Sequence, residues 1–114
     1  MIRHIVLMKC KPDAAQQDID EMFTALAALK DSIPGILAFE GGENNSPENI
    51  NRGYTHGFTM DFADEHAREV YLPHPKHEKV KTTIQKILDG SADSVLVIDF
   101  AIEDTDTYEV YQTS

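Results

Sequence analysis

Two kinds of hydrophobic spacing alternate along this chain, and their order limits the folds that it can adopt. Four short stretches carry apolar residues in runs or at every second position, which is the spacing of β-strands. These stretches are residues 2–9, 36–43, 54–62 and 94–100. Residues 14–31, and two shorter stretches between residues 64 and 88, carry apolar residues three and four positions apart, as amphipathic helices do. This order predicts a ferredoxin-like α+β domain, βαββαβ, in which the four strands form one antiparallel sheet.

Local features refine this outline. Asp13 and Asp64 each precede a helical stretch and can accept hydrogen bonds from its first turn, so we expect both to be N-caps. Pro75 suits the first position of the last helix, because it has no amide hydrogen to leave unpaired there. The last strand, residues 94–100, is apolar at successive positions, and we therefore expect it to be buried on both faces.

The charge of the chain excludes some classes of partner. Its 114 residues include 20 acidic and 10 basic side chains, which give a net charge of −10. A field of that sign repels nucleic acid and anionic lipid, so we expect neither to be a partner. Cys10 is the single cysteine and cannot form an internal disulfide, and no apolar run reaches the roughly 20 residues of a membrane span. The chain starts with a strand rather than a signal peptide, and we expect a cytoplasmic protein.

The length fits one compact domain, which we place at residues 1–102, followed by an acidic tail at residues 103–114. The tail holds four acidic and no basic residues, and we expect its end to be frayed or docked on a partner chain. Helices cover only one face of such a sheet. An identical sheet from a second subunit is the simplest cover for the other face, so we expect a homodimer.

The segment from Tyr71 to His77, with the sequence Tyr-Leu-Pro-His-Pro-Lys-His, carries the most chemical information. If His74 caps the last helix and Pro75 is its first residue, His77 lies in the first turn, where the helix dipole disfavours a positive charge. The imidazole is then neutral near pH 7, as a general base must be. We expect Tyr71 to be its hydrogen-bonding partner and predict that these two residues are catalytic.

Two further histidines are expected to face the space between the sheet and the helices. His4 and His56 lie on strands that this fold places side by side, and alternation puts each of them on a mostly apolar face. An apolar pocket with a few polar groups is the usual form of a small-molecule site. The residues predicted to line it are His4, Val6, Met8, Phe23, Leu26, His56, Phe58 and Val97.

These residues also have a purely structural interpretation. A histidine near the end of an apolar strand is more often a hydrogen-bonded core residue than a catalyst. His74 and His77 are spaced as two metal ligands could be, but no cysteine or carboxylate cluster accompanies them, so we expect no metal. Asp99 interrupts an apolar strand and needs a hydrogen-bonding partner if it is buried, at a sheet end or an interface.

Five segments in this order resemble the stress-responsive dimeric α/β-barrel (Dabb) family. They are residues 4–7, 33–36, 53–58, 71–77 and 97–100. The resemblance runs from residue 1 to about residue 102, and its most specific part is the Tyr-x-x-His-Pro-x-His segment. It implies a ferredoxin-like protomer and a homodimer in which two sheets face each other as a barrel.

One plant member of that family cyclises a linear polyketide by an aldol reaction without a cofactor. The resemblance implies that His77 would act as acid and base and that Tyr71 would assist it. It also implies that His4 and His56 would lie in the pocket. The chain departs from that cyclase at Leu26, where the cyclase has a tyrosine, and in having no tryptophan. The pocket must therefore differ in shape.

Three functions remain open. The first is acid and base chemistry on a small carbonyl compound, of a cyclase, lyase or isomerase type, which needs a base and a donor for the developing oxyanion and no cofactor. The second is a non-catalytic, stress-related or ligand-sequestering homodimer in which the histidines only complete the core. The third is a haem-degrading or cofactor-free monooxygenase on the same fold, for which the Tyr-x-x-His-Pro-x-His segment is not typical.

Overall fold

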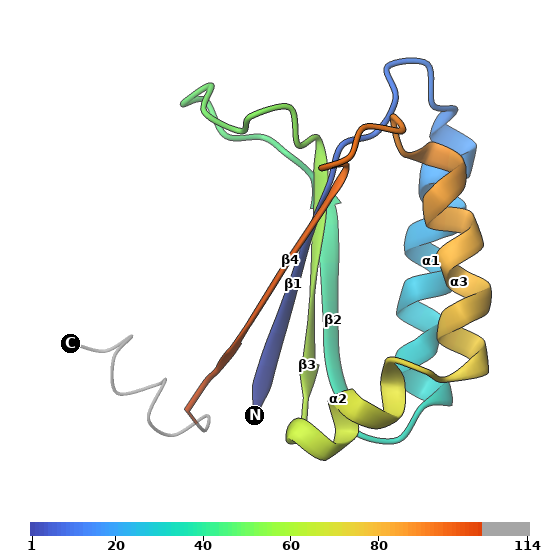
Figure 1. Cartoon of the computed structure of the whole chain (residues 1–114), viewed down its shortest axis with the longest axis vertical. Coiled ribbons are helices and arrows are strands. Elements are labelled where there is room, and N and C mark those ends of the chain that lie inside the picture. Colours follow the sequence, from blue (N-terminus) through green and yellow to red (C-terminus); the bar gives the residue numbers. More distant parts are fainter. Residues whose placement is uncertain (104–114) are drawn as a thin grey trace.

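The structure, a computed structural model, describes residues 1–103 of the chain. Within that part, four strands and three helices follow one another in the predicted order (Figure 1). They are β1 (Ile2–Met8), α1 (Gln16–Ser32), β2 (Ile36–Glu43), β3 (His56–Phe62), α2 (Glu65–Tyr71), α3 (Pro75–Ile87) and β4 (Val95–Ala101). The strands form one antiparallel sheet in the order β2-β3-β1-β4, which is the ferredoxin-like arrangement that the sequence predicts.

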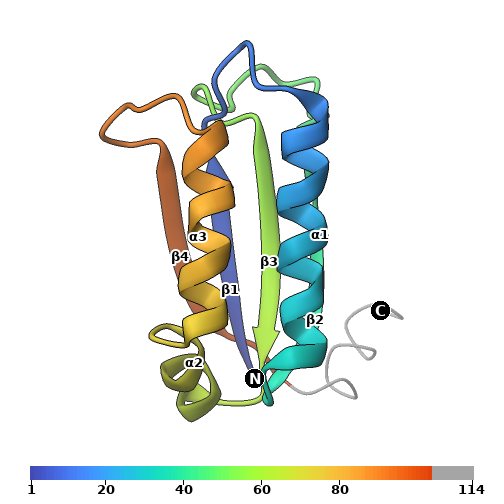
Figure 2. The ribbon, with the colours of Figure 1, turned by 90° about the vertical axis from the view of Figure 1, so that its right-hand side faces the viewer.

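Both long helices lie on one face of the sheet. Figure 2 shows α1 and α3 side by side in front of the strands, α1 on the side of β2 and α3 on the side of β4. The short helix α2 lies at the end of the sheet where β1 begins and β3 ends (Figure 1). The opposite face, which we call the open face, carries no helix in the described part of the chain (Figure 1).

The core lies between the sheet and the two long helices. Burial alternates along β1, where Ile2, His4, Val6 and Met8 are buried and the residues between them are half-buried. Because successive side chains of a strand point to opposite faces, the buried set faces the helices. The largest fully buried side chains are Tyr71, Phe62, Met8, Met22, Leu26, Ile33, Met60 and Ile87. Among the described residues, the two buried polar side chains are His4 and His77.

The predicted residues at the helix N-termini are found at two of the three helices, α2 and α3. The Asp64 side chain accepts a hydrogen bond from an amide in the first turn of α2 at 2.8 Å. His74 caps α3 through its Nδ1, with Pro75 as the first helical residue. The prediction that Asp13 caps α1 is wrong, because Asp13 lies within a turn that a hydrogen bond from the Ala14 amide to the Lys11 carbonyl closes. The N-cap is Ala15, which makes no side-chain hydrogen bond.

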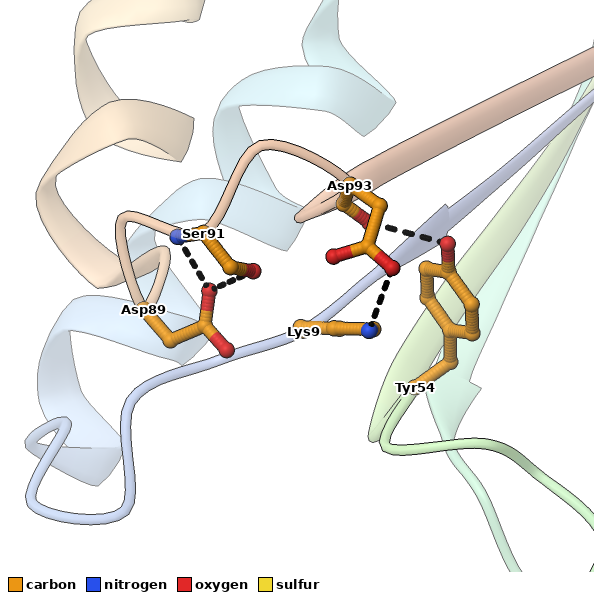
Figure 3. A network of polar contacts seen from close by, with 5 residues as sticks. All are labelled: Lys9, Tyr54, Asp89, Ser91 and Asp93. Atoms are coloured by element: carbon orange, nitrogen blue, oxygen red, sulfur yellow. Dashed lines mark hydrogen bonds and ion pairs between the residues drawn. The ribbon is translucent and has the colours of Figure 1, made fainter.

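The strand β3 begins two residues later than the alternation predicts, at His56. Tyr54 belongs instead to a polar network at the end of the sheet, in which its hydroxyl donates to the backbone carbonyl of Asp93 at 2.8 Å (Figure 3). Lys9 binds the Asp93 carboxylate at 2.9 Å, and its ammonium lies 5.0 Å from the centre of the Tyr54 ring. The network ties the connection between α3 and β4 to the loop before β3.

Gly41 brings β2 into close contact with α1. A Cβ atom at this position would lie 2.7 Å from a ring carbon of Phe23 and 2.9 Å from the Cβ atom of Phe58. No side chain fits in that space, so glycine is the residue that allows the strand and the helix to pack at this distance.

The prediction that the last strand is buried on both faces is wrong for the single chain. All seven residues of β4 are exposed, among them Leu96 at 43%, Ile98 at 54% and Phe100 at 46%. The strand lies at the edge of the sheet, and residues 1–103 supply no second layer on the open face. A run of apolar residues predicts burial, but it does not say whether the cover comes from the same chain.

The predicted acidic tail, residues 103–114, lies outside the described residues except for its first position. The predicted domain boundary at residue 102 comes directly after β4, and the boundary itself stays a prediction. Within residues 1–103, no helix is both long enough and apolar enough to cross a membrane.

Candidate functional site

Tyr71 and His77 meet in the core at the junction of α2 and α3. Tyr71 is the last residue of α2, and His77 lies in the first turn of α3. Their rings are stacked, with centroids 4.0 Å apart and an angle of 24° between the planes. Tyr71 is 1% exposed and His77 is 8% exposed. The structure therefore brings the two predicted catalytic residues together, and their catalytic role stays a prediction.

The imidazole of His77 is held by the backbone. Its Nδ1 donates a hydrogen bond to the carbonyl oxygen of Leu72 at 2.9 Å, which places the proton of the neutral ring on Nδ1. Burial lowers the pKa of His77, against a smaller opposing effect of the Leu72 carbonyl. The ring is therefore neutral at pH 7, and the lone pair on Nε2 can accept a proton.

Tyr71 does not make the hydrogen bond to His77 that the sequence predicts. Among the hydrogen bonds within residues 1–103, none joins the two side chains, which touch face to face instead. The hydroxyl lies in the plane of its own ring, so in a stack of nearly parallel rings it points past the imidazole. Burial raises the pKa of Tyr71, and the phenol therefore keeps its proton.

A third ring, that of His4, is hydrogen-bonded to Asp99, which is not among the predicted site residues. The Nδ1 of His4 donates to Asp99 Oδ1 at 2.7 Å, from β1 to the neighbouring strand β4. Arg68 of α2 donates to the other carboxylate oxygen of Asp99 at 3.3 Å. The His4 ring centroid lies 6.1 Å from that of Tyr71. The sequence indicated that Asp99 needs a partner, but it did not indicate which one.

The other predicted pocket residues lie in different surroundings. The buried ones, which belong to the continuous core, are Val6, Met8, Leu26 and Phe58. Phe23 and His56 are half-buried, with ring centroids 6.2 Å apart. Val97 is 50% exposed on the edge strand. His56 pairs with Met8 in the sheet, four positions along β1 from His4, so the two histidines do not converge. The pocket role of all these residues stays a prediction.

A surface hollow lies near His56 rather than near the ring stack. It has a volume of about 220 Å³ and includes Cys10 and Thr55 in its wall, but neither Tyr71 nor His77. Because the two stacked rings are almost inaccessible to solvent, a ligand can reach them only if neighbouring side chains move.

His74 and His77 each use one ring nitrogen in a hydrogen bond. The Nδ1 of His74 accepts a hydrogen bond from the Lys76 amide at 3.1 Å, and the Nδ1 of His77 donates to the backbone. Within residues 1–103, no group of three or more histidine, cysteine, aspartate or glutamate side chains could hold a metal ion.

The pairing of His4 with Asp99 has a measurable consequence for stability. We expect Asp99→Ala to lower the free energy of unfolding by about 1–3 kcal/mol, because it leaves a buried nitrogen of His4 without an acceptor and removes a partner of Arg68. Asp93→Ala, which breaks the pair between Lys9 and a largely exposed carboxylate, is the control and should have a much smaller effect. Urea unfolding measures both, and equal losses would contradict a structural role for the His4–Asp99 pair.

The lowered pKa of His77 predicts that stability falls with falling pH. In the unfolded chain the imidazole binds a proton near its ordinary pKa of 6.5, whereas the folded chain binds it only at lower pH. The unfolded state therefore carries more protons in this window, and stability rises with pH through it. Between pH 7 and pH 5 the free energy of unfolding should drop more in the wild type than in His77→Asn. Parallel drops, measured by urea unfolding at both pH values, would show that another group is responsible.

Comparisons with known proteins agree with this fold. Residues 2–102 match the family described as Stress responsive A/B Barrel Domain. The chain is 35% identical over 99 residues to the stress-response A/B barrel domain-containing protein HS1 of Arabidopsis thaliana, covering 87% of each chain. It is 25% identical over 76 residues to olivetolic acid cyclase of Cannabis sativa, covering 67% of this chain and 75% of the cyclase.

A solved structure from Jannaschia sp. CCS1, described as a dimeric ferredoxin-like protein of unknown function, matches with a TM-score of 0.79 at 28% identity. The match covers 89% of this chain and 98% of that one. The family match spans nearly the whole described part of the chain, and the solved structure has the same fold. The chain therefore belongs to the stress-responsive A/B barrel (Dabb) family, as its motifs indicate.

Proposed function

We propose that this protein binds a small carbonyl compound beside the Tyr71–His77 stack and transfers a proton on it without a cofactor. His77 takes the proton at Nε2, and the Tyr71 hydroxyl donates a hydrogen bond to the carbonyl oxygen. The orientation of His77 carries the proposal: the Leu72 carbonyl holds its Nδ1, and burial keeps the ring neutral, so the second nitrogen is an unprotonated base.

The two side chains suit the charges of this reaction. Removing a proton next to a carbonyl group leaves an enolate, whose negative charge develops on the oxygen. Tyr71 can stabilise that charge because burial keeps its phenol protonated. Once the new bond has formed or the old one has broken, the protonated His77 returns its proton to the product. Lyase, isomerase and cyclase reactions share this sequence of steps.

His4 completes the proposed site from the sheet. Its ring lies near that of Tyr71, and the hydrogen bond to Asp99 fixes its Nδ1 and leaves its Nε2 for a substrate. A carboxylate behind an imidazole orients the ring, as in other acid and base sites. His4 is therefore assigned to binding the carbonyl compound, with Asp99 as the residue that positions it.

The relative named olivetolic acid cyclase supports this class of chemistry. The Tyr-x-x-His-Pro-x-His segment, through which this chain resembles it, supplies both Tyr71 and His77. The substrate is proposed to differ from that of the cyclase, because Leu26 stands where the cyclase has a tyrosine and its side chain is 1% exposed in the core.

The proposal is tested by hydrogen–deuterium exchange in a panel of small aliphatic and aromatic ketones, followed by NMR in D₂O with and without protein. Proton abstraction next to the carbonyl exchanges that hydrogen even when no further reaction follows. We expect at least one ketone to exchange faster with protein than in buffer and to shift the ring resonances of His77. Buffer-rate exchange throughout the panel, with no change at His77, would contradict the proposal.

The burial of the site favours a second candidate function. With Tyr71 at 1% and His77 at 8% exposure, the stack can also be a packed part of the core of a non-catalytic, stress-related or ligand-sequestering protein. On this alternative, the ketones leave His77 unperturbed, and replacing His77 changes only stability.

We also propose that the protein is a homodimer. The apolar side chains of β4 are exposed in the single chain, and a related solved structure is described as dimeric. Covering the open face with a second copy removes these side chains from water, which stabilises a domain of this size.

A further inference from the structure

An ion pair lies between the buried rings of the proposed site and the solvent. The rings of His4, Tyr71 and His77 are all buried. The pair formed by Arg68 and Asp99 is more accessible, with side chains that are 25% and 22% exposed. Asp99 also binds His4, so the pair connects the ring cluster to the surface. A substrate that enters from this side meets Arg68 before it meets the rings.

The helix α2 places Arg68 next to Tyr71. The two residues are three positions apart, and side chains with this spacing are neighbours on a helix, with Cβ atoms about 5–6 Å apart. Tyr71 points into the core, whereas Arg68 lies at the border of the buried side of α2 and reaches across to Asp99 on β4. A positive charge is therefore held beside the ring whose hydroxyl is proposed to bind the carbonyl oxygen.

The guanidinium group of Arg68 has donors to spare. Within residues 1–103, its side chain makes one hydrogen bond, from Nη1 to Asp99 Oδ2 at 3.3 Å. This is longer than the roughly 2.7–2.9 Å of a strong bond between charged groups. The edge formed by Nε and Nη2 makes no hydrogen bond in the described part of the chain. Such an edge matches the two oxygens of a carboxylate, which it can bind through two parallel hydrogen bonds.

The surroundings of Arg68 are compatible with an anion, although the chain as a whole is acidic. The helix α3, which follows α2, carries four lysines and one glutamate. Asp99 is the acidic neighbour, and both of its oxygens already accept hydrogen bonds, one from His4 and one from Arg68. Salt screens charges that are more than about 10 Å away, so the groups close to Arg68 matter more than the net charge of −10.

We propose that Arg68 binds a carboxylate group of the substrate, which is therefore an oxo acid rather than a plain ketone. This inference rests on the proposed function and names the substrate class of the same site. The carboxylate binds the edge formed by Nε and Nη2, and the ketone group of the same molecule lies between the Tyr71 hydroxyl and Nε2 of His77. Arg68 is then the residue that determines specificity for the acid.

A positive charge at this place also suits the reaction. His77 takes the proton from the carbon next to the ketone, and the electron pair of the broken C–H bond forms the enolate. An enolate made from an oxo acid carries a second negative charge, on its carboxylate. Arg68 compensates that charge, while the Tyr71 hydroxyl stabilises the enolate oxygen. The proton returns from His77 to carbon, so the step consumes no oxidant, reductant or cofactor.

Two compounds that differ in one charge test this assignment. 4-Oxopentanoate and its methyl ester have the same ketone group, but only the first has a carboxylate. NMR in D₂O follows the exchange of the hydrogens next to the ketone, and each rate is divided by the rate of the same compound in buffer. With the wild type, we expect the acceleration to be about 10–100-fold larger for the acid, as for the gain of a charged hydrogen-bonded contact. We call this ratio the acid preference.

Variants of Arg68 connect the acid preference to this side chain. Arg68→Met removes the charge but keeps a long side chain, and the acid preference should disappear. Arg68→Lys keeps the charge without the fork and should retain part of it. A ratio is measured because the loss of Arg68 also leaves Asp99 with one partner fewer, which alters the site for both compounds. Lys79→Met removes an exposed positive charge from α3 as the control and should leave the acid preference unchanged.

The outcomes separate this inference from the proposed function. Equal acceleration of the two compounds, or an acid preference that survives in Arg68→Met, would overturn the role of Arg68 alone. The same holds if neither compound exchanges faster than in buffer while a plain ketone does. Buffer-rate exchange of every ketone and of both compounds would overturn the proposed function, and this inference with it.

Binding to the wild type gives an independent measurement if Arg68→Met fails to fold. The chain has three arginines, so the Nε–H resonance of Arg68 can be assigned by through-bond correlation to its backbone amide. Addition of 4-oxopentanoate should shift this resonance, and addition of the methyl ester should leave it in place. Equal shifts with both compounds, or no shift with the acid, would show that Arg68 does not bind the carboxylate.

Discussion

Replacing Tyr71 with alanine is expected to destabilise the protein by about 3–5 kcal/mol, as the loss of a large aromatic side chain from a packed core does. Tyr71 is 1% exposed, stacks on His77, and lies 5.1 Å from the ring of Phe62. Removing it leaves a cavity that three neighbouring rings line. Urea unfolding of the purified variant measures the loss. A loss below about 1 kcal/mol would mean that the ring is not a central part of the core.

Tyr71→Phe separates the packing of this residue from its chemistry. The hydroxyl makes no hydrogen bond to His77, so its removal is expected to change stability little. If the phenol stabilises an oxyanion, the same variant should lose most of the ketone exchange activity. An unchanged rate in Tyr71→Phe would remove the hydroxyl from the mechanism and leave Tyr71 a structural residue.

The second large effect is expected at His77. His77→Asn keeps an amide that can donate to the Leu72 carbonyl, as Nδ1 does, but it lacks the nitrogen that accepts the proton. We expect the rate of proton exchange to fall by about 10²–10⁴-fold, the usual contribution of a general base. NMR exchange rates measure the effect on the best ketone of the panel.

The neighbouring His74 supplies the control for this experiment. His74→Asn retains a side chain that caps α3 well and leaves the ring stack in place, so the exchange rate should stay at the wild-type level. If His77→Asn is as active as His74→Asn, His77 is not the base, and the non-catalytic alternative gains support.

The fold could be predicted because its signals are local. The Asp64 cap and the His74-Pro75 start of α3 depend on groups within one turn of each other, and both are found as predicted. The same segment places His77 in the first turn, where it meets Tyr71. Asp13 shows the limit of such signals, since it lies in a turn two residues before the N-cap, Ala15, and does not cap the helix.

The detailed geometry of the site could not be predicted, because it depends on the register of distant strands. His4 and Asp99 are 95 positions apart in the chain and become neighbours only when β1 pairs with β4. The sequence shows a histidine and an aspartate on apolar strands, but not their alignment. It likewise does not show whether Tyr71 meets His77 through its edge or its face, since that depends on the angle between α2 and α3.

The exposure of β4 has a different cause. Its apolar residues satisfy the pattern of a buried strand, whereas the single chain leaves all of them in contact with water. The apolar pattern of a strand reflects the surroundings of its side chains in the assembled protein. A second subunit can supply part of those surroundings.

The close contact at Gly41 affects on which side of the core a small molecule could be accommodated. Phe23 lies so close to the backbone of β2 that it cannot swing outward on that side. The contact leaves no space between α1 and β2 at this point. We therefore expect room beside the buried rings to arise on the other side, between the sheet and α3.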